Sequence, residues 1–208
     1  ITYTLYNASG SYNVTTFSTA VRSINWTGLA DGAYTFNVTL TDRANQRNTT
    51  ATRSARVDTT TPSASYGGQT ENHGANLTRS NIVVNITGSD SFLANLTVVL
   101  YNSSGQVNRT TVTGTEVFIN VTSLADGSYT FNGTSSDYAN NINTTATRTV
   151  TIDTVSPLIS YQGTTEGDNT NLSRTWVFAN VSVTEANEIN ITYTLYNASG
   201  SYNVTTFS

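Results

Sequence analysis

The chain has 208 residues, a formal net charge of −4 and only 11% charged residues. It contains no cysteine, methionine or lysine, so the sequence excludes disulfide bonds, thiol chemistry and cysteine-based metal sites. No basic surface indicates nucleic-acid binding, and no apolar run of about 18 residues predicts a membrane-spanning helix.

Between residues 58 and 152 the alternation of apolar and polar residues predicts seven short strands and no helix. In the second of them, Ile82, Val84 and Ile86 share one face. Seven short strands in 95 residues, separated by turns, are typical of an immunoglobulin-like β-sandwich, so the predicted fold class is all-β. In chain order the strands cover Ser63–Tyr66, Ile82–Thr87, Asn95–Tyr101, Gln106–Val112, Val117–Thr122, Tyr129–Ser135 and Thr144–Ile152.

Tyr129 follows the sequence Leu-Ala-Asp-Gly-Ser and opens the sixth strand. This position fits a tyrosine corner, in which the hydroxyl group bonds to backbone a few residues upstream. The alternative is that Tyr129 is an ordinary core residue. In either case Tyr129 and Phe131 are expected to be buried and Asn132 exposed, and likewise Tyr34 and Phe36 against Asn37.

Internal repetition organises the chain. Residues 29–62 match residues 124–157 at 21 of 34 positions without a gap, at an offset of 95. Residues 1–18 recur letter for letter at 191–208, at an offset of 190. The sequence therefore predicts tandem modules of 95 residues that alternate in a 190-residue super-repeat.

The repeat also predicts the domain boundaries. We expect residues 58–152 to be a complete module, residues 1–57 the C-terminal part of a preceding one, and residues 153–208 the N-terminal part of the next. If separate subunits polymerised by lending a strand, the identical segments 1–18 and 191–208 would compete for one place. We therefore expect the chain to be a piece of one long covalent array.

The pattern L-A-D-G-x-Y-T-F-N, D-x-A-N, N-T-T-A-T-R and D-T-x-x-P resembles the tandem Ig-like repeats of prokaryotic, especially archaeal, surface proteins. The likeness covers the whole chain. Many members have Gly after the Ala, where this chain has Asn45 and Asn140. The resemblance implies a cell-surface stalk, an adhesin, an S-layer-associated protein or a filament, and specifies a fold rather than a chemistry.

Asn-x-Ser/Thr, the acceptor sequence for N-glycosylation, is the one strong chemical signal. It accounts for 18 of the 25 asparagines, where random placement in a chain this rich in Ser and Thr would give roughly eight. Eight such sites recur in every copy of the module, and alternation predicts that Asn85, Asn120 and Asn132 face solvent. The alternative is that these are simply polar surface residues copied by duplication. The candidate glycosylation sites are Asn7, Asn13, Asn25, Asn37, Asn48, Asn76, Asn85, Asn95, Asn102, Asn108, Asn120, Asn132, Asn143, Asn171, Asn180, Asn190, Asn197 and Asn203.

A weaker pattern concerns acidic residues. Asp58 and Asp153 lie at the expected module junctions, where hard oxygen ligands could hold Ca²⁺, and Asp137 could contribute from a neighbouring hairpin turn. The alternative is turn chemistry, because Asp readily hydrogen-bonds its own backbone. We expect no other metal or cofactor.

Together these patterns favour a structural component of an extracellular, heavily N-glycosylated filament or cell-surface stalk. Its expected partners are neighbouring modules, other filaments or cell surfaces. The alternatives are an adhesin spacer and a carbohydrate-binding sandwich that would use Tyr6, Tyr101 and Tyr196. No catalytic grouping accompanies the single histidine, His73, so we do not expect an enzyme.

Overall fold

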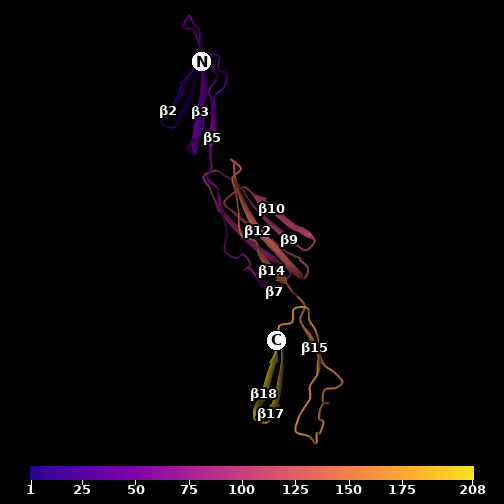
Figure 1. Cartoon of the computed structure of the whole chain (residues 1–208). Helices are drawn as coiled ribbons and strands as arrows, with labels where there is room; N and C mark the ends of the chain where they lie inside the picture. The colour runs from indigo at the N-terminus through magenta and orange to yellow at the C-terminus, as the bar shows by residue number, and fades with distance from the viewer. The chain divides into compact units, whose positions relative to one another are not determined.

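The computed structural model describes residues 1–208 and contains 18 strands and no helix (Figure 1). This confirms the all-β prediction. The chain forms two compact units, Ile1–Asp153 and Thr154–Ser208. There is no helix that is long and apolar enough to cross a membrane.

Residues 63–152 form two sheets that enclose one core. The larger sheet has the strand order β10-β9-β12-β14-β7, with β13 paired to β12, and the smaller has the order β11-β8-β6. The bounds are β6 (Ser63–Tyr66), β7 (Ala75–Leu77), β8 (Ile82–Ser89), β9 (Leu93–Asn102), β10 (Gly105–Val112), β11 (Glu116–Val121), β12 (Gly127–Asp137), β13 (Ile142–Thr144) and β14 (Arg148–Ile152).

The predicted strands agree closely with these bounds. Six of the seven have both ends within two residues of the observed ones. The seventh was predicted as one strand, 144–152, whereas the chain forms β13 and then β14, separated by residues 145–147. The strand β7 was not predicted; it lies parallel to β14, with Val150 opposite Ala75.

The core lies between the two sheets. Ile82, Val84 and Ile86 of β8 are fully buried, as the alternation predicted. They belong to one cluster with Leu96, Val98 and Leu100 of β9 and with Phe131 of β12. Burial of large aliphatic and aromatic side chains is the main favourable contribution to folding in such a domain.

Tyr129 forms a tyrosine corner and is also a core residue, as the two interpretations of the sequence predicted. Its hydroxyl group donates a hydrogen bond to the carbonyl oxygen of Ala125 at 2.9 Å, and its side chain is buried. Tyr34 repeats the arrangement with Ala30 at 2.9 Å. The tyrosine corner therefore fixes the turn that precedes β12 and also the turn that precedes its counterpart in residues 1–57.

Residues 1–57 form a single sheet. Its order is β2-β1-β3-β4, with β5 paired to β3, and the bounds are β1 (Thr2–Asn7), β2 (Gly10–Thr16), β3 (Gly32–Thr41), β4 (Arg47–Thr49) and β5 (Arg53–Val57). None of the other sheets in residues 1–208 is paired with it, and it has no partner of the kind that β11-β8-β6 supplies to the larger sheet. Accordingly Phe36 is only half-buried, whereas its counterpart Phe131 is fully buried.

Residues 154–208 form two separate hairpin-like pairs. The strand β15 (Leu158–Tyr161) pairs with β16 (Val181–Thr184), and β17 (Ile191–Asn197) pairs with β18 (Gly200–Phe207). At the 95-residue offset these four strands correspond to β6, β8, β9 and β10. Counterparts of β11 to β14 are not part of this unit.

Candidate functional site

The candidate glycosylation asparagines lie mostly at the surface. Of the 18, 17 are exposed or half-buried, and one, Asn85, is buried. Asn120 is exposed, as predicted from its strand, whereas Asn132 and Asn37 are half-buried. Asn48 of β4 and Asn143 of β13 are exposed, as attachment of a bulky sugar requires.

Two recurrent local geometries hold six of these asparagines by their side-chain carbonyl oxygen. In Asn13, Asn108 and Asn203 the Thr two residues later donates its hydroxyl hydrogen to Asn Oδ1, at 2.8 to 3.0 Å. In the hairpin turns at Asn7, Asn102 and Asn197 the backbone N–H two residues later donates to Oδ1 at 2.9 Å. Neither bond uses Nδ2, the nitrogen to which a sugar would be attached.

Asn85 contradicts the expectation of a solvent-facing side chain. It is 8% exposed, and its Nδ2 donates to Glu116 Oε1 at 2.7 Å. The segment before β7 covers it: a Cβ atom placed on Gly67 would lie 2.8 Å from Asn85 Cγ, and the Thr70 hydroxyl bonds the Asn85 backbone on both sides. Alternation placed Asn85 on the outer face of β8 correctly, but this loop folds over that face.

Three carboxylates meet where residues 1–57 lead into β6. Oxygen atoms of Asp58, Asp90 and Asp137 all lie within 4.8 Å of one another. Asp58 and Asp137 are two of the three predicted Ca²⁺ ligands. The third, Asp153, is not in this group, and Asp90 takes part instead. Three hard oxygen donors at this spacing are a donor set that suits Ca²⁺.

Asp137 also organises the hairpin turn between β12 and β13. Its Oδ1 accepts the backbone N–H groups of Ala139 and Asn141, both at 2.8 Å, and Oδ2 accepts Asn141 Nδ2 at 2.7 Å. Burial raises the pKa of Asp137, but the hydrogen bonds from Asn141 and the turn outweigh it and lower the pKa overall. Asp137 is therefore held as the anion, which fits both readings made from the sequence: turn chemistry and a cation ligand.

Asp90 was missed because its counterpart, Glu185, differs in residue type. Both carboxylates make the same local turn: Asp90 Oδ1 accepts the N–H of Phe92 at 2.6 Å, and Glu185 Oε1 accepts that of Asn187 at 2.8 Å. The sequence signal that could have identified Asp90 is that both repeat positions, 90 and 185, carry a negative charge, although the residue types differ. Asp42, the counterpart of Asp137, likewise accepts the N–H groups of Ala44 and Gln46.

Asp31, which is not part of the carboxylate cluster, anchors the segment that joins residues 1–57 to β6. Its Oδ1 accepts both the N–H and the hydroxyl hydrogen of Thr59, at 2.9 and 2.8 Å, and its Oδ2 accepts the Thr60 hydroxyl at 2.8 Å. Nearby, the Arg56 guanidinium lies 3.6 Å from the centre of the Phe92 ring, and Asn141 Nδ2 donates to the Asp58 carbonyl oxygen at 3.0 Å. The segment is thus fixed by directional contacts on both sides.

The Asp31 contacts predict a specific pH dependence. Hydrogen bonds from Thr60 and Thr59 hold the pKa of Asp31 below its ordinary value. A depressed folded-state pKa means that the anchoring is complete above the unfolded value, about 3.9, and is lost as the pH falls through the folded one. We expect the Thr59 amide resonance to shift on acidification with a midpoint below about 3.9. The variant Asp31→Asn should show no such titration, and a midpoint at or above 3.9 in the unaltered chain would contradict the assignment.

Three other repeated charges of residues 58–152, Glu71, Arg79 and Arg148, have structural partners. Glu71 pairs with Arg79 at 2.6 Å, and their counterparts Glu166 and Arg174 pair in the same way. Arg148 lies 4.0 Å from the centre of the Tyr66 ring and donates to the Glu71 carbonyl oxygen at 2.8 Å.

No family model matches the chain, and no curated protein matches it significantly. Two solved structures show a likeness in fold. The fibronectin(III)-like modules of CbhA from Clostridium thermocellum share 16% identity, with 73% of this chain and 76% of that one covered and a TM-score of 0.39. Dimeric latent PorU from Porphyromonas gingivalis shares 19% identity and has a TM-score of 0.34; 73% of this chain aligns with only 16% of that one. Neither likeness carries a function over to this chain.

Proposed function

We propose that the chain is a structural segment of an extracellular, heavily N-glycosylated filament or cell-surface stalk built from tandem Ig-like modules. The observation that carries the proposal is the repeated set of acceptor asparagines. Seven of the eight repeated positions keep their side chains exposed or half-buried in each copy. A surface on which acceptor sites recur along every copy suits a sugar coat over a polar β-protein, with neighbouring modules and cell surfaces as its partners.

Glycopeptide mass spectrometry of the native protein tests this proposal. We expect sugar on Asn120, Asn48, Asn143 and the turn asparagines, because their amide groups lie at the surface. Asn85 provides an internal control: it has the same acceptor sequence, but its Nδ2 is engaged by Glu116 beneath a loop, so it should remain unmodified. Unmodified Asn120, Asn143 and Asn102 would refute the glycosylated-stalk proposal.

We also propose that Asp58, Asp90 and Asp137 bind Ca²⁺ and brace the segment between residues 1–57 and β6. Three neighbouring carboxylates repel one another, and a divalent cation would relieve that repulsion. Calorimetric titration of the full chain with Ca²⁺ should show saturable binding, with a dissociation constant on the order of 10⁻⁴ to 10⁻³ M for a site of this kind. Asp90→Asn should abolish it while leaving the Asp137 turn intact. Absence of saturable heat in the unaltered chain would refute the site.

The two alternative functions predicted from the sequence, a carbohydrate-binding sandwich and an adhesin spacer, have less structural support. A carbohydrate-binding face would need several exposed aromatic rings in a row. Of the three candidate tyrosines, Tyr101 is 39% exposed and Tyr196 is 69% exposed, while Tyr6 is half-buried, and they occur once every 95 residues rather than in a row. An adhesin spacer would have the same surface as a stalk, and the two differ only in what lies at the end of the array.

A further inference from the structure

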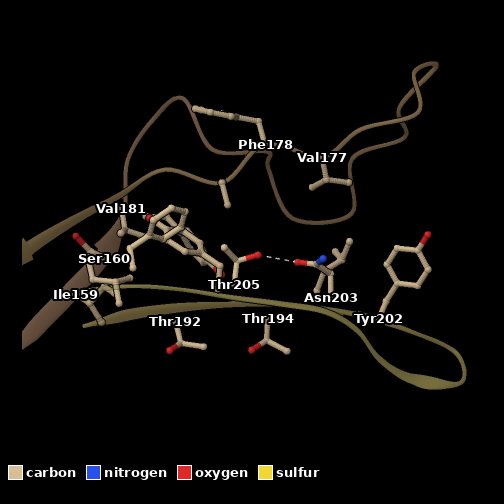
Figure 2. Close-up of a pocket in the computed structure, with 16 residues that line it drawn as sticks. Ile159, Ser160, Val177, Phe178, Val181, Thr192, Thr194, Tyr202, Asn203 and Thr205 are labelled. Carbon is tan, nitrogen blue, oxygen red and sulfur yellow. Dashed lines mark hydrogen bonds between the residues drawn. The ribbon is translucent and has the colours of Figure 1, made fainter. Parts of the chain in front are cut away.

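An apolar groove runs between the two strand pairs of residues 154–208. Its volume is about 960 Å³, and β15 and β16 form one wall while β17 and β18 form the other. Figure 2 shows Ile159 and Val181 on the first wall, with the segment that bears Val177 and Phe178 above them. Val177 is 58% exposed and Leu195 is 42% exposed, although their counterparts Ile82 and Leu100 are fully buried.

The strand β17 has the same sequence as β1 but lacks one of its neighbours. The strand β1 pairs with β2 on one edge and with β3 on the other, where Leu5 lies opposite Phe36. The third member of this set, β9, likewise lies between β10 and β12, with Leu100 opposite Phe131. In contrast, β17 pairs only with β18. One edge of β17 therefore presents backbone donors and acceptors that are paired in both other copies.

The occupant that fits this edge is present in the chain as β3. Leu5 and Leu195 have identical neighbours in sequence, yet Leu5 is 2% exposed and Leu195 is 42% exposed. In the complete two-sheet body, the counterpart of β3 lies beside β9 and brings Phe131 into the core. Phe36, which has no facing sheet in residues 1–57, is the corresponding side chain on β3.

Side-chain sizes favour β3 over its counterpart β12. In residues 63–152 the fully buried Ile86 leaves room only for Gly at position 133: a Cβ atom there would lie 2.4 Å from Ile86 Cγ1. In the groove, the counterpart of Ile86 is the smaller Val181, and the residue of β3 at this register is the larger Val38. The pair Ile–Gly is thus replaced by Val–Val, in which a smaller side chain on one strand makes room for a larger one on the other.

We propose that the groove of residues 154–208 receives a second copy of residues 19–57, with β3 added to the free edge of β17. The register would place Phe36 of that copy opposite Leu195 and Val38 opposite Tyr193, as in the β1–β3 pair. Val21–Trp26 would then lie beside residues 177–182, because the counterpart strand β11 pairs with residues 82–87 of β8. The inference concerns packing alone and stands whether or not the asparagines carry sugar.

Thiol labelling tests the proposal, because the chain has no cysteine. Leu195→Cys in the 208-residue chain should react rapidly. Appending a second copy of residues 19–57 after Ser208 should slow the reaction roughly tenfold or more, since the thiol becomes protected by a folded core. Leu5→Cys supplies the reference rate for the same strand when β3 covers it.

A matched control separates docking from mere added length. In the appended copy only, Phe36→Asp would place a charge in the core and should restore rapid labelling of Cys at position 195, while the rate at position 5 stays unchanged. An unchanged rate at position 195 with the extension attached would overturn the proposal.

Discussion

Replacing Phe131 by Ala is expected to lower the free energy of unfolding of residues 63–152 by about 3–5 kcal/mol. The Phe131 ring is fully buried and meets the Tyr66 ring edge-on, with their centres 5.8 Å apart. It also joins β12 to both β9 and β14 through its backbone. Truncation would remove buried apolar surface and leave a cavity between the sheets, because the backbone pairing prevents them from closing on the gap.

Urea denaturation followed by far-ultraviolet circular dichroism provides the measurement. Phe118→Ala is the matched control, since Phe118 is 52% exposed on β11 and its loss should cost no more than about 0.5 kcal/mol. If the two substitutions had similar effects, the assignment of Phe131 to the centre of the core would be wrong.

Gly133→Val is expected to destabilise the same body by about 1–3 kcal/mol through overpacking. A Cβ atom at position 133 would lie within 2.9 Å of three carbon atoms of Ile86, which is itself fully buried and cannot swing into solvent. The counterpart of Gly133 is Val38 on β3, so the substitution introduces the side chain that the repeat has at this position in residues 1–57.

A double-substitution cycle distinguishes this pairing from a general intolerance of β12. Ile86→Val alone should cost about 0.5–1.5 kcal/mol. Combined with Gly133→Val it reproduces the Val–Val pair of positions 181 and 38, and the double variant should be less destabilised than the sum of the single changes by at least about 0.5 kcal/mol. Strict additivity in urea unfolding would show that the two positions do not compensate each other.

The strands were predictable because their signal is local. Ile82, Val84 and Ile86 alternate with polar residues, and a strand with one buried face requires that period. The strand β7 gave no such signal: it has three residues, follows a Gly-rich loop, and is held by its parallel pairing with β14, which lies about 75 residues away in sequence. Long-range pairing of this kind leaves no periodicity to detect.

The same distinction explains the errors at the candidate sites. Alternation assigns Asn85 to the outer face of β8, but whether an outer face meets water depends on loops, and here the segment around Gly67 covers it. Two of the three residues of the carboxylate cluster were predicted, because Asp58 and Asp137 are aspartates in both copies of the repeat. Asp90 recurs only as a charge, at Glu185, and its proximity to the other two depends on how the hairpin turn and the joining segment meet.

The parallel contact between β7 and β14 determines how this body would respond to a mechanical pull. Tension applied between Ser63 and Ile152 would first peel β6 from β8, an antiparallel pair of only four residues. The load would then pass along the loop to β7, whose direction matches that of β14, so that Ala75–Leu77 and Val150–Ile152 would be drawn past each other. Hydrogen bonds loaded in this shear geometry must break together rather than in succession. The three-residue pairing of β7 with β14 would thus resist the applied force and delay extension of the remaining strands.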